Sequence, residues 1–97
     1  MEGVMVGKTW RRIDGSGLAY WGRCLLTDLI FWANKDGYHV DVYDGRDATS
    51  GRLLCRLMVN IGETFHFEFG AGLAMDVGIY VDGVDTAIVT TVAFIPL

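Results

Sequence analysis

The 97-residue chain is predicted to form one all-β domain, an antiparallel β-sandwich of about seven or eight strands with a jelly-roll-like arrangement. Apolar and polar residues alternate with a period of two in several segments, as they do in half-buried strands. Glycine-containing turns separate these segments. No segment combines a helix N-cap with an apolar stripe at helical spacing. The length is that of a single domain, and no helix is needed to account for it.

The chain divides into two parts. Residues 1–17 are predicted to be an N-terminal arm or an edge strand, and residues 18–97 to be the β-sandwich domain. Trp10 stands beside Arg11 and Arg12. Trp and Arg dominate the binding energy of protein interfaces, so this triplet is a candidate anchor on a partner. Packing of Trp10 against its own domain is an equally good interpretation.

The most apolar segment follows, and its aromatic residues and the break at Gly22 favour extended structure over a helix. We predict one long strand from about Arg23 to Asn34, with two apolar faces. One face carries Leu29, Phe31 and Ala33, and the other carries Ile30 and Trp32. Such a strand is expected in the centre of a sheet or beneath a neighbour. Residues 35–37 (Lys-Asp-Gly) are predicted to form a hairpin turn.

The segment Tyr38–Val59 is predicted to be a pair of antiparallel strands joined by an ordered loop that begins at Asp44 and Gly45. One face of the pair is apolar and comprises Tyr38, Val40, Val42, Leu53, Cys55, Leu57 and Val59. This face must be covered, so a second sheet is required.

Three further strands are predicted, and the turn at residues 60–62 precedes the first of them. Thr64–Phe69 should point Phe65, Phe67 and Phe69 inward and Thr64, His66 and Glu68 outward. These three rings are predicted to carry much of the core, and burial of each contributes on the order of 2 kcal/mol. Gly70–Gly72 is expected to bend the chain and Leu73–Met75 to cross back. Strands at 78–82 and 86–95 then complete the fold.

The composition excludes some classes of partner. A net charge of −4 argues against binding to nucleic-acid phosphates. No apolar segment approaches the length of a membrane span, and no signal peptide is visible, so we expect neither a membrane partner nor export. The apolar fraction of 52% is high for a small monomer, which indicates a dense core or apolar surface in a subunit interface.

The charges are unevenly distributed along the chain. All eight Lys and Arg residues lie at or before Arg56, whereas residues 57–97 contain only acidic charges. These acids are either solvated or face basic residues of the first half, in the same chain or in a neighbour. We predict a homo-oligomer, a trimer or another closed ring, with head-to-tail contacts. The candidate pairs join Arg11, Arg12 or Arg23 to Glu63, Glu68 or Asp85.

Residues with catalytic or metal-binding chemistry are few. Cys24 and Cys55 lie in apolar runs and are predicted to be free, inert thiols. His39 and His66 fall on the outward side of their strands and lack further ligands for zinc. We therefore expect no enzyme activity, no metal and no cofactor. A calcium site at Asp41, Asp44 and Asp47 is an alternative to an ordinary turn role for these residues.

The segments at residues 42–57 (VYDGRDATSGRLLCRL) and 62–83 (GETFHFEFGAGLAMDVGIYVDG) together resemble small β-sandwich virion proteins of tailed bacteriophages. In that pattern a strand ends in a Tyr-Asp-Gly corner, here Tyr43–Gly45, and a later strand reads Gly-hydrophobic-Tyr-Val, here Gly78–Val81. The resemblance covers roughly residues 23–95. It implies a non-enzymatic structural protein of the virion, assembled in the host cytoplasm. A capsid decoration or minor capsid protein, a head–tail protein or a fibre-like component is implied, docked on a major capsid or tail protein.

The candidate interface residues are Trp10, Arg11, Arg12, Trp21, Trp32 and Tyr43. An alternative function is a carbohydrate- or receptor-binding module in which surface aromatic rings stack on a sugar. The candidates for stacking are Tyr20, Trp21, Trp32, Tyr38, Tyr43 and Tyr80. The same rings could instead fill the faces of the sheets or a subunit contact.

Overall fold

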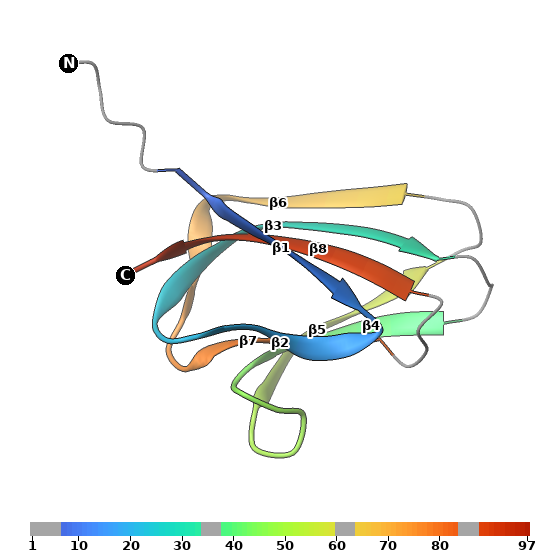
Figure 1. Cartoon of the computed structure of the whole chain (residues 1–97), viewed down its shortest axis with the longest axis horizontal. Helices are drawn as coiled ribbons and strands as arrows, with labels where there is room; N and C mark the ends of the chain where they lie inside the picture. The colour runs from blue at the N-terminus through green and yellow to red at the C-terminus, as the bar shows by residue number, and fades with distance from the viewer. Residues whose placement is uncertain (1–6, 34–37, 60–63, 84–87) are drawn as a thin grey trace.

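The computed structural model describes residues 7–33, 38–59, 64–83 and 88–97. Eight strands form two four-stranded antiparallel sheets that pack face to face, and the described ranges contain no helix (Figure 1). In this part of the chain there is accordingly no helix that could cross a membrane. The predicted all-β sandwich is confirmed.

The two sheets contain four strands each. Sheet A has the order β1 (Thr9–Asp14), β8 (Ile88–Pro96), β3 (Cys24–Ala33) and β6 (Thr64–Met75). Sheet B has the order β2 (Ser16–Trp21), β7 (Gly78–Gly83), β4 (Tyr38–Asp44) and β5 (Arg52–Val59). β1 and β6 are therefore the edges of sheet A, and β2 and β5 are the edges of sheet B.

This strand order is that of a jelly roll. β1 pairs with β8, β2 with β7, β3 with β6 and β4 with β5, always antiparallel. The chain is thus one long hairpin whose tip is the loop between β4 and β5, rolled up so that successive pairs lie in alternate sheets. The predicted pair of antiparallel strands at Tyr38–Val59 forms this tip.

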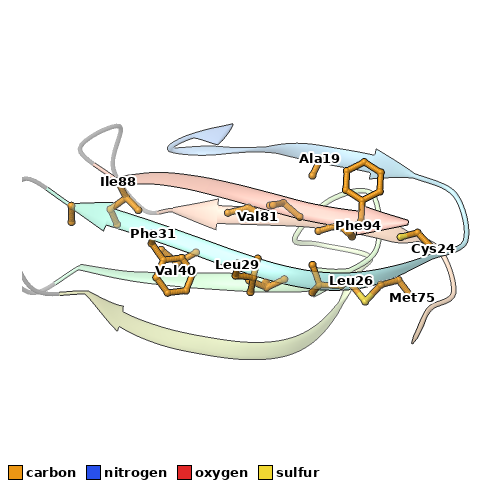
Figure 2. Packing of buried hydrophobic residues seen from close by; sticks show 14 residues of the cluster. Ala19, Cys24, Leu26, Leu29, Phe31, Val40, Met75, Val81, Ile88 and Phe94 are labelled. Atoms are coloured by element: carbon orange, nitrogen blue, oxygen red, sulfur yellow. The ribbon is translucent and has the colours of Figure 1, made fainter. Parts of the chain in front are cut away.

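The core lies between the sheets and is supplied mainly by β3, β4, β7 and β8 (Figure 2). Its fully buried larger side chains are Leu26, Leu29, Phe31, Val40, Val42, Met75, Ile79, Val81, Ile88, Val92 and Phe94. β3 is central in sheet A, as its two apolar faces predict, and Leu29, Phe31 and Ala33 point into the core. Ile30 and Trp32 point away from the core, toward the outer surface of sheet A.

The phenylalanines of β6 contribute less to the core than predicted. Phe67 is paired in register with the buried Leu29, and its ring centroid lies 5.7 Å from that of Phe31, so it does point inward. However, β6 is an edge strand, and Phe67 remains 39% exposed. Phe65 and Phe69 are only partly buried. The prediction that these three rings carry much of the core is therefore wrong.

A β-bulge on β5 changes which leucine reaches the core. Val42 is opposite Cys55 and Tyr43 is opposite Leu53, so that Leu54 is the additional residue. Leu54 packs against the core, whereas Leu53 points outward and is 47% exposed. The inward direction predicted for Leu53 is wrong, because one extra residue reverses the alternation.

The connection between β3 and β4 also differs from the prediction. The turn residues 35–37 lie outside the described residues, as do residues 60–62. The strands on either side, β3 and β4, lie in different sheets and do not pair. The predicted hairpin is therefore wrong, and this connection joins the two sheets.

β6 bends where predicted but crosses later than expected. Gly70 and Gly72 have φ angles of 60° and 113°, which glycine adopts at little cost. Leu73–Met75 remain paired with β3, so the crossing to sheet B begins only after Met75. The structure therefore places the crossing at residues 76–77.

Candidate functional site

The outer surface of sheet A carries the larger group of predicted interface residues. Trp10, Arg12, Ile30, Trp32 and Val89 alternate with core residues on β1, β3 and β8 and share this surface, which we call the tryptophan face. Trp10 is 50% exposed and Trp32 is 41% exposed. Arg12 lies between them and bonds Asp14 through Nε, at 2.8 Å from Oδ1.

Arg11 does not belong to the tryptophan face. It is opposite the buried Val92, so its side chain starts on the core side of β1 and reaches solvent at the edge of the sheet. The sequence grouped Arg11 with Arg12, but the alternation of the strand sends them to opposite sides.

A polar cluster lies at the β6 edge of the tryptophan face. Asp28 is only 3% exposed and occupies the position where the β3 pairing shifts register. Its Oδ1 accepts a hydrogen bond from Lys8 Nζ at 2.7 Å, and its Oδ2 is 2.8 Å from His66 Nε2. The hydrogen bond from Lys8 is the main reason that the pKa of Asp28 is lowered from 3.8 to about 2.

This cluster has three potential metal ligands. The nearest ligand atoms of Asp28, His66 and Glu68 lie within 4.8 Å of one another, the one such group in the described ranges. Both carboxylate oxygens of Asp28 already have partners, and the Lys8 ammonium repels a cation at this position. The arrangement therefore neutralises a buried carboxylate, and we assign it that structural role.

The outer surface of sheet B carries the remaining candidates. Leu18, Tyr80, Tyr43 and Leu53 are opposite one another on the four neighbouring strands and form a continuous row. The rings of Tyr43 and Tyr80 are 6.4 Å apart. Trp21 is 64% exposed near one end of the row, and the guanidinium of Arg46 lies 5.7 Å from its ring centroid. We call these residues the tyrosine face.

Asp44, in the Tyr-Asp-Gly corner, connects the tip of the hairpin to the β6–β7 crossing. The side chain is almost fully buried. Its Oδ2 accepts the N–H of Asp76 at 3.0 Å, and its Oδ1 accepts those of Val77 at 2.9 Å and Gly78 at 3.3 Å. Burial alone would raise the pKa of this carboxyl group, but the three donors more than offset it and the pKa is lowered.

The three aspartates considered for calcium have separate roles. Asp41 receives two hydrogen bonds from Arg56, at 2.7 and 2.9 Å. Asp47 accepts from the backbone N–H and the hydroxyl of Ser50, both at 2.7 Å. Asp44 binds backbone as described above. Asp41 therefore pairs across two strands, Asp44 holds the β6–β7 crossing and Asp47 makes a turn contact, so the calcium alternative gains no support.

The thiols and histidines do not form a reactive pair in the described part of the chain. Cys24 is buried, and desolvation raises its pKa to about 11. Burial also raises the pKa of Cys55. The two thiols are not joined. No pocket is present among the described residues.

Comparison of the chain with known protein families, with curated proteins and with solved structures finds no match.

The six predicted interface residues thus separate into two opposite surfaces and one edge. Sequence reasoning missed the Lys8–Asp28–His66 cluster, whose members are 20 and 38 residues apart. One signal was available, because a single acid in the apolar run around Asp28 must be neutralised if the strand is buried. Which residues neutralise it depends on strand order.

Proposed function

We propose that the chain is a non-enzymatic structural protein of a virion, which packs against copies of itself and docks on a capsid or tail protein. The observation that carries the proposal is the tryptophan face, where two half-exposed tryptophans and Arg12 share the outer surface of sheet A. Exposed Trp and Arg residues that share one surface are typical of protein interfaces, since they supply most of the binding energy there.

Two further observations support the viral assignment. Jelly rolls occur in viral capsid proteins, although also in lectins, so the fold alone does not assign a function. The sequence resemblance to small phage virion proteins includes the Tyr-Asp-Gly corner, and Asp44 of that corner accepts three backbone hydrogen bonds. The contacts of Asp44 in this corner are structural, which accords with an assembly role.

The proposal is tested on purified particles. Mass spectrometry should detect the chain in intact virions, and cryo-electron microscopy should locate it on the head or tail. Trp32→Glu should lower its incorporation at least tenfold, because a charge on an apolar contact is costly. Trp21→Glu, on the opposite surface, is the matched control and should leave incorporation unchanged. Absence of the chain from intact particles refutes the proposal.

A second candidate function is binding of a carbohydrate or receptor through the tyrosine face. The specific observation is that Tyr43, Tyr80 and Trp21 lie on one surface. A glycan array should then show binding that Trp21→Ala abolishes and Trp32→Ala leaves intact. No binding above background, or binding that Trp21→Ala leaves intact, counts against this function.

The ring predicted from the charges stays a prediction. Its contact would join β1, which carries Arg11 and Arg12, to β6, which carries Glu68, and these strands are the opposite edges of sheet A. The mass of the protein in solution tests it directly.

A further inference from the structure

One side of the sandwich is apolar and incompletely covered. β5 and β6 are the last strands of their sheets, and both lie on the side opposite to β1 and β2, which contact each other. Their inward side chains are only partly buried, although they belong to the core side of the sheets. These residues, which we call the open side, are Leu54, Cys55, Leu57, Phe65, Phe67 and Phe69.

The opposite side of the sandwich has a feature that prevents edge pairing. Arg11 occupies a core-side position on the edge strand β1. An inward-pointing charge at an edge opposes the addition of another strand, because pairing would bury that charge. Among the described residues of β5 and β6, the one charge at a core-side position is Arg52, at the start of β5, where its largely exposed side chain lies 3.7 Å from the Asp44 carboxylate. The six residues of the open side are themselves uncharged, so another strand pair can cover them without burying a charge.

We propose that a second copy of the chain covers the open side, with the two copies related by a two-fold axis. The open side of a second copy is equally apolar and can therefore cover the first, and a two-fold axis brings the two open sides together in one contact. The inward residues of both copies then form one continuous core, and each sheet gains four strands. This inference rests on the proposed assembly role, since it names the first partner in that assembly.

The charges of the edge strands select the pairing. On the outer surface β5 carries Arg56, which also bonds Asp41, whereas β6 carries Glu68, which pairs with no Lys or Arg of the described residues. A two-fold axis that placed β5 beside β5 and β6 beside β6 would bring like charges together. The other two-fold arrangement places β6 of each copy beside β5 of its partner, so that opposite charges meet. Sheet A of one copy then continues into sheet B of the other.

The test compares two lysine variants by analytical ultracentrifugation over a range of protein concentrations. The wild-type chain should reach twice its mass of 10.7 kDa as the concentration rises. Phe67→Lys should weaken the dimer at least roughly 100-fold, because it buries a charge in the joint core. Leu18→Lys is the matched control, since Leu18 is also 39% exposed but lies on the far edge strand β2, and it should leave the dimer unchanged. A wild-type monomer at millimolar concentration, or a trimer, overturns the proposal.

A second measurement keeps the test valid if Phe67→Lys fails to fold. Alkylation of Cys55 in the wild-type chain should slow as the concentration rises, since Cys55 belongs to the open side. Cys24 is buried within one copy and should react slowly at every concentration. A Cys55 rate that does not depend on concentration refutes the contact.

The charge argument has its own test. Glu68→Arg should weaken the dimer up to about fivefold per contact, and Glu68→Gln should weaken it less. If Glu68→Arg leaves the affinity unchanged, β6 does not lie beside β5 and the arrangement is wrong. Failure of these solution tests leaves the virion proposal open, because the particle experiment decides that question independently.

Discussion

Replacement of Asp44 by alanine should destabilise the fold more than its position at the end of a strand suggests. The carboxylate accepts three backbone N–H groups from residues 76–78, where the chain passes from sheet A to sheet B. Gly78 is buried, so its donor would lose its partner without gaining water, whereas Asp76 and Val77 are exposed and could be hydrated. Gly45 N adds a backbone bond to Gly78 O at 3.2 Å, which the variant retains.

The magnitude follows from these contacts. A hydrogen bond to a charged group contributes about 1.5–3 kcal/mol, and a buried donor left without a partner costs about 1–3 kcal/mol. Removing a desolvated charge recovers part of this loss. We therefore expect Asp44→Ala to lower the free energy of unfolding by about 3 kcal/mol, which corresponds to a fall in Tm of roughly 12–24 °C for a domain of this size.

The assay is thermal and urea unfolding, followed by circular dichroism at one fixed protein concentration. Asp47→Ala is the matched control, because Asp47 follows closely in the chain but is partly exposed, and its carboxylate contacts only neighbouring residues of the loop, chiefly Ser50. It should change the midpoint little. Equal effects of the two substitutions would refute the reasoning, since the N–H donors of residues 76–78 would then not depend on Asp44.

The pH dependence gives a second readout of the same bonds. The pKa of Asp44 is lowered in the folded state, so its contribution is fully present above its unfolded pKa of about 3.9 and is lost as the pH falls through the folded value. The wild-type protein should therefore lose stability below about pH 4, and Asp44→Ala should lose less over that range.

Three other predictions concern single residues. Asp28→Asn should cost roughly 1–2 kcal/mol near neutral pH, and this difference from wild type should shrink between about pH 4 and the folded pKa of about 2, as measured by urea unfolding. Gly78→Ala should destabilise by at least about 2 kcal/mol, because its Cβ would collide with the backbone oxygen of Tyr20; a stable variant would show that β2 and β7 can separate. Thiol titration after denaturation without reductant should find both Cys24 and Cys55 free, whereas the native protein should react slowly at pH 8, since burial raises both pKa values; a disulfide in mass spectrometry would contradict this.

The sequence predicts local features of this fold better than the partners of its strands. The β4–β5 pair was found because its two strands are close in the chain and its loop has turn chemistry. The hairpin predicted at residues 35–37 was wrong because turn residues of the same kind can join strands of one sheet or of two different sheets. The strand order decides between these two connections, and it is not visible in the turn. The face of Leu53 was wrong because a bulge leaves no clear mark on the alternation.

The sequence predicted the individual candidate interface residues, but not which of them share a surface. Trp10 and Trp32 are 22 positions apart in the sequence, and they share a face because β8 lies between β1 and β3. Trp21 and Tyr43 share the other face because β7 lies between β2 and β4. No periodicity within one strand carries this information, because it arises from the rolling of the long hairpin.

The two-fold contact and the tryptophan face become related once sheet A of one copy continues into sheet B of the other. The tryptophan face of one copy and the tyrosine face of its partner would then lie on the same surface of the dimer, so the two tryptophan faces would lie on opposite surfaces of it. A capsid or tail protein would meet two equivalent docking surfaces, so one dimer could connect two neighbouring partners. Trp32→Glu should then remove docking without changing the mass in solution, whereas Phe67→Lys should remove the dimer and, with it, any connection that needs both surfaces. If Phe67→Lys leaves particle incorporation intact while abolishing the dimer, docking depends on the tryptophan face alone and the connecting role is wrong.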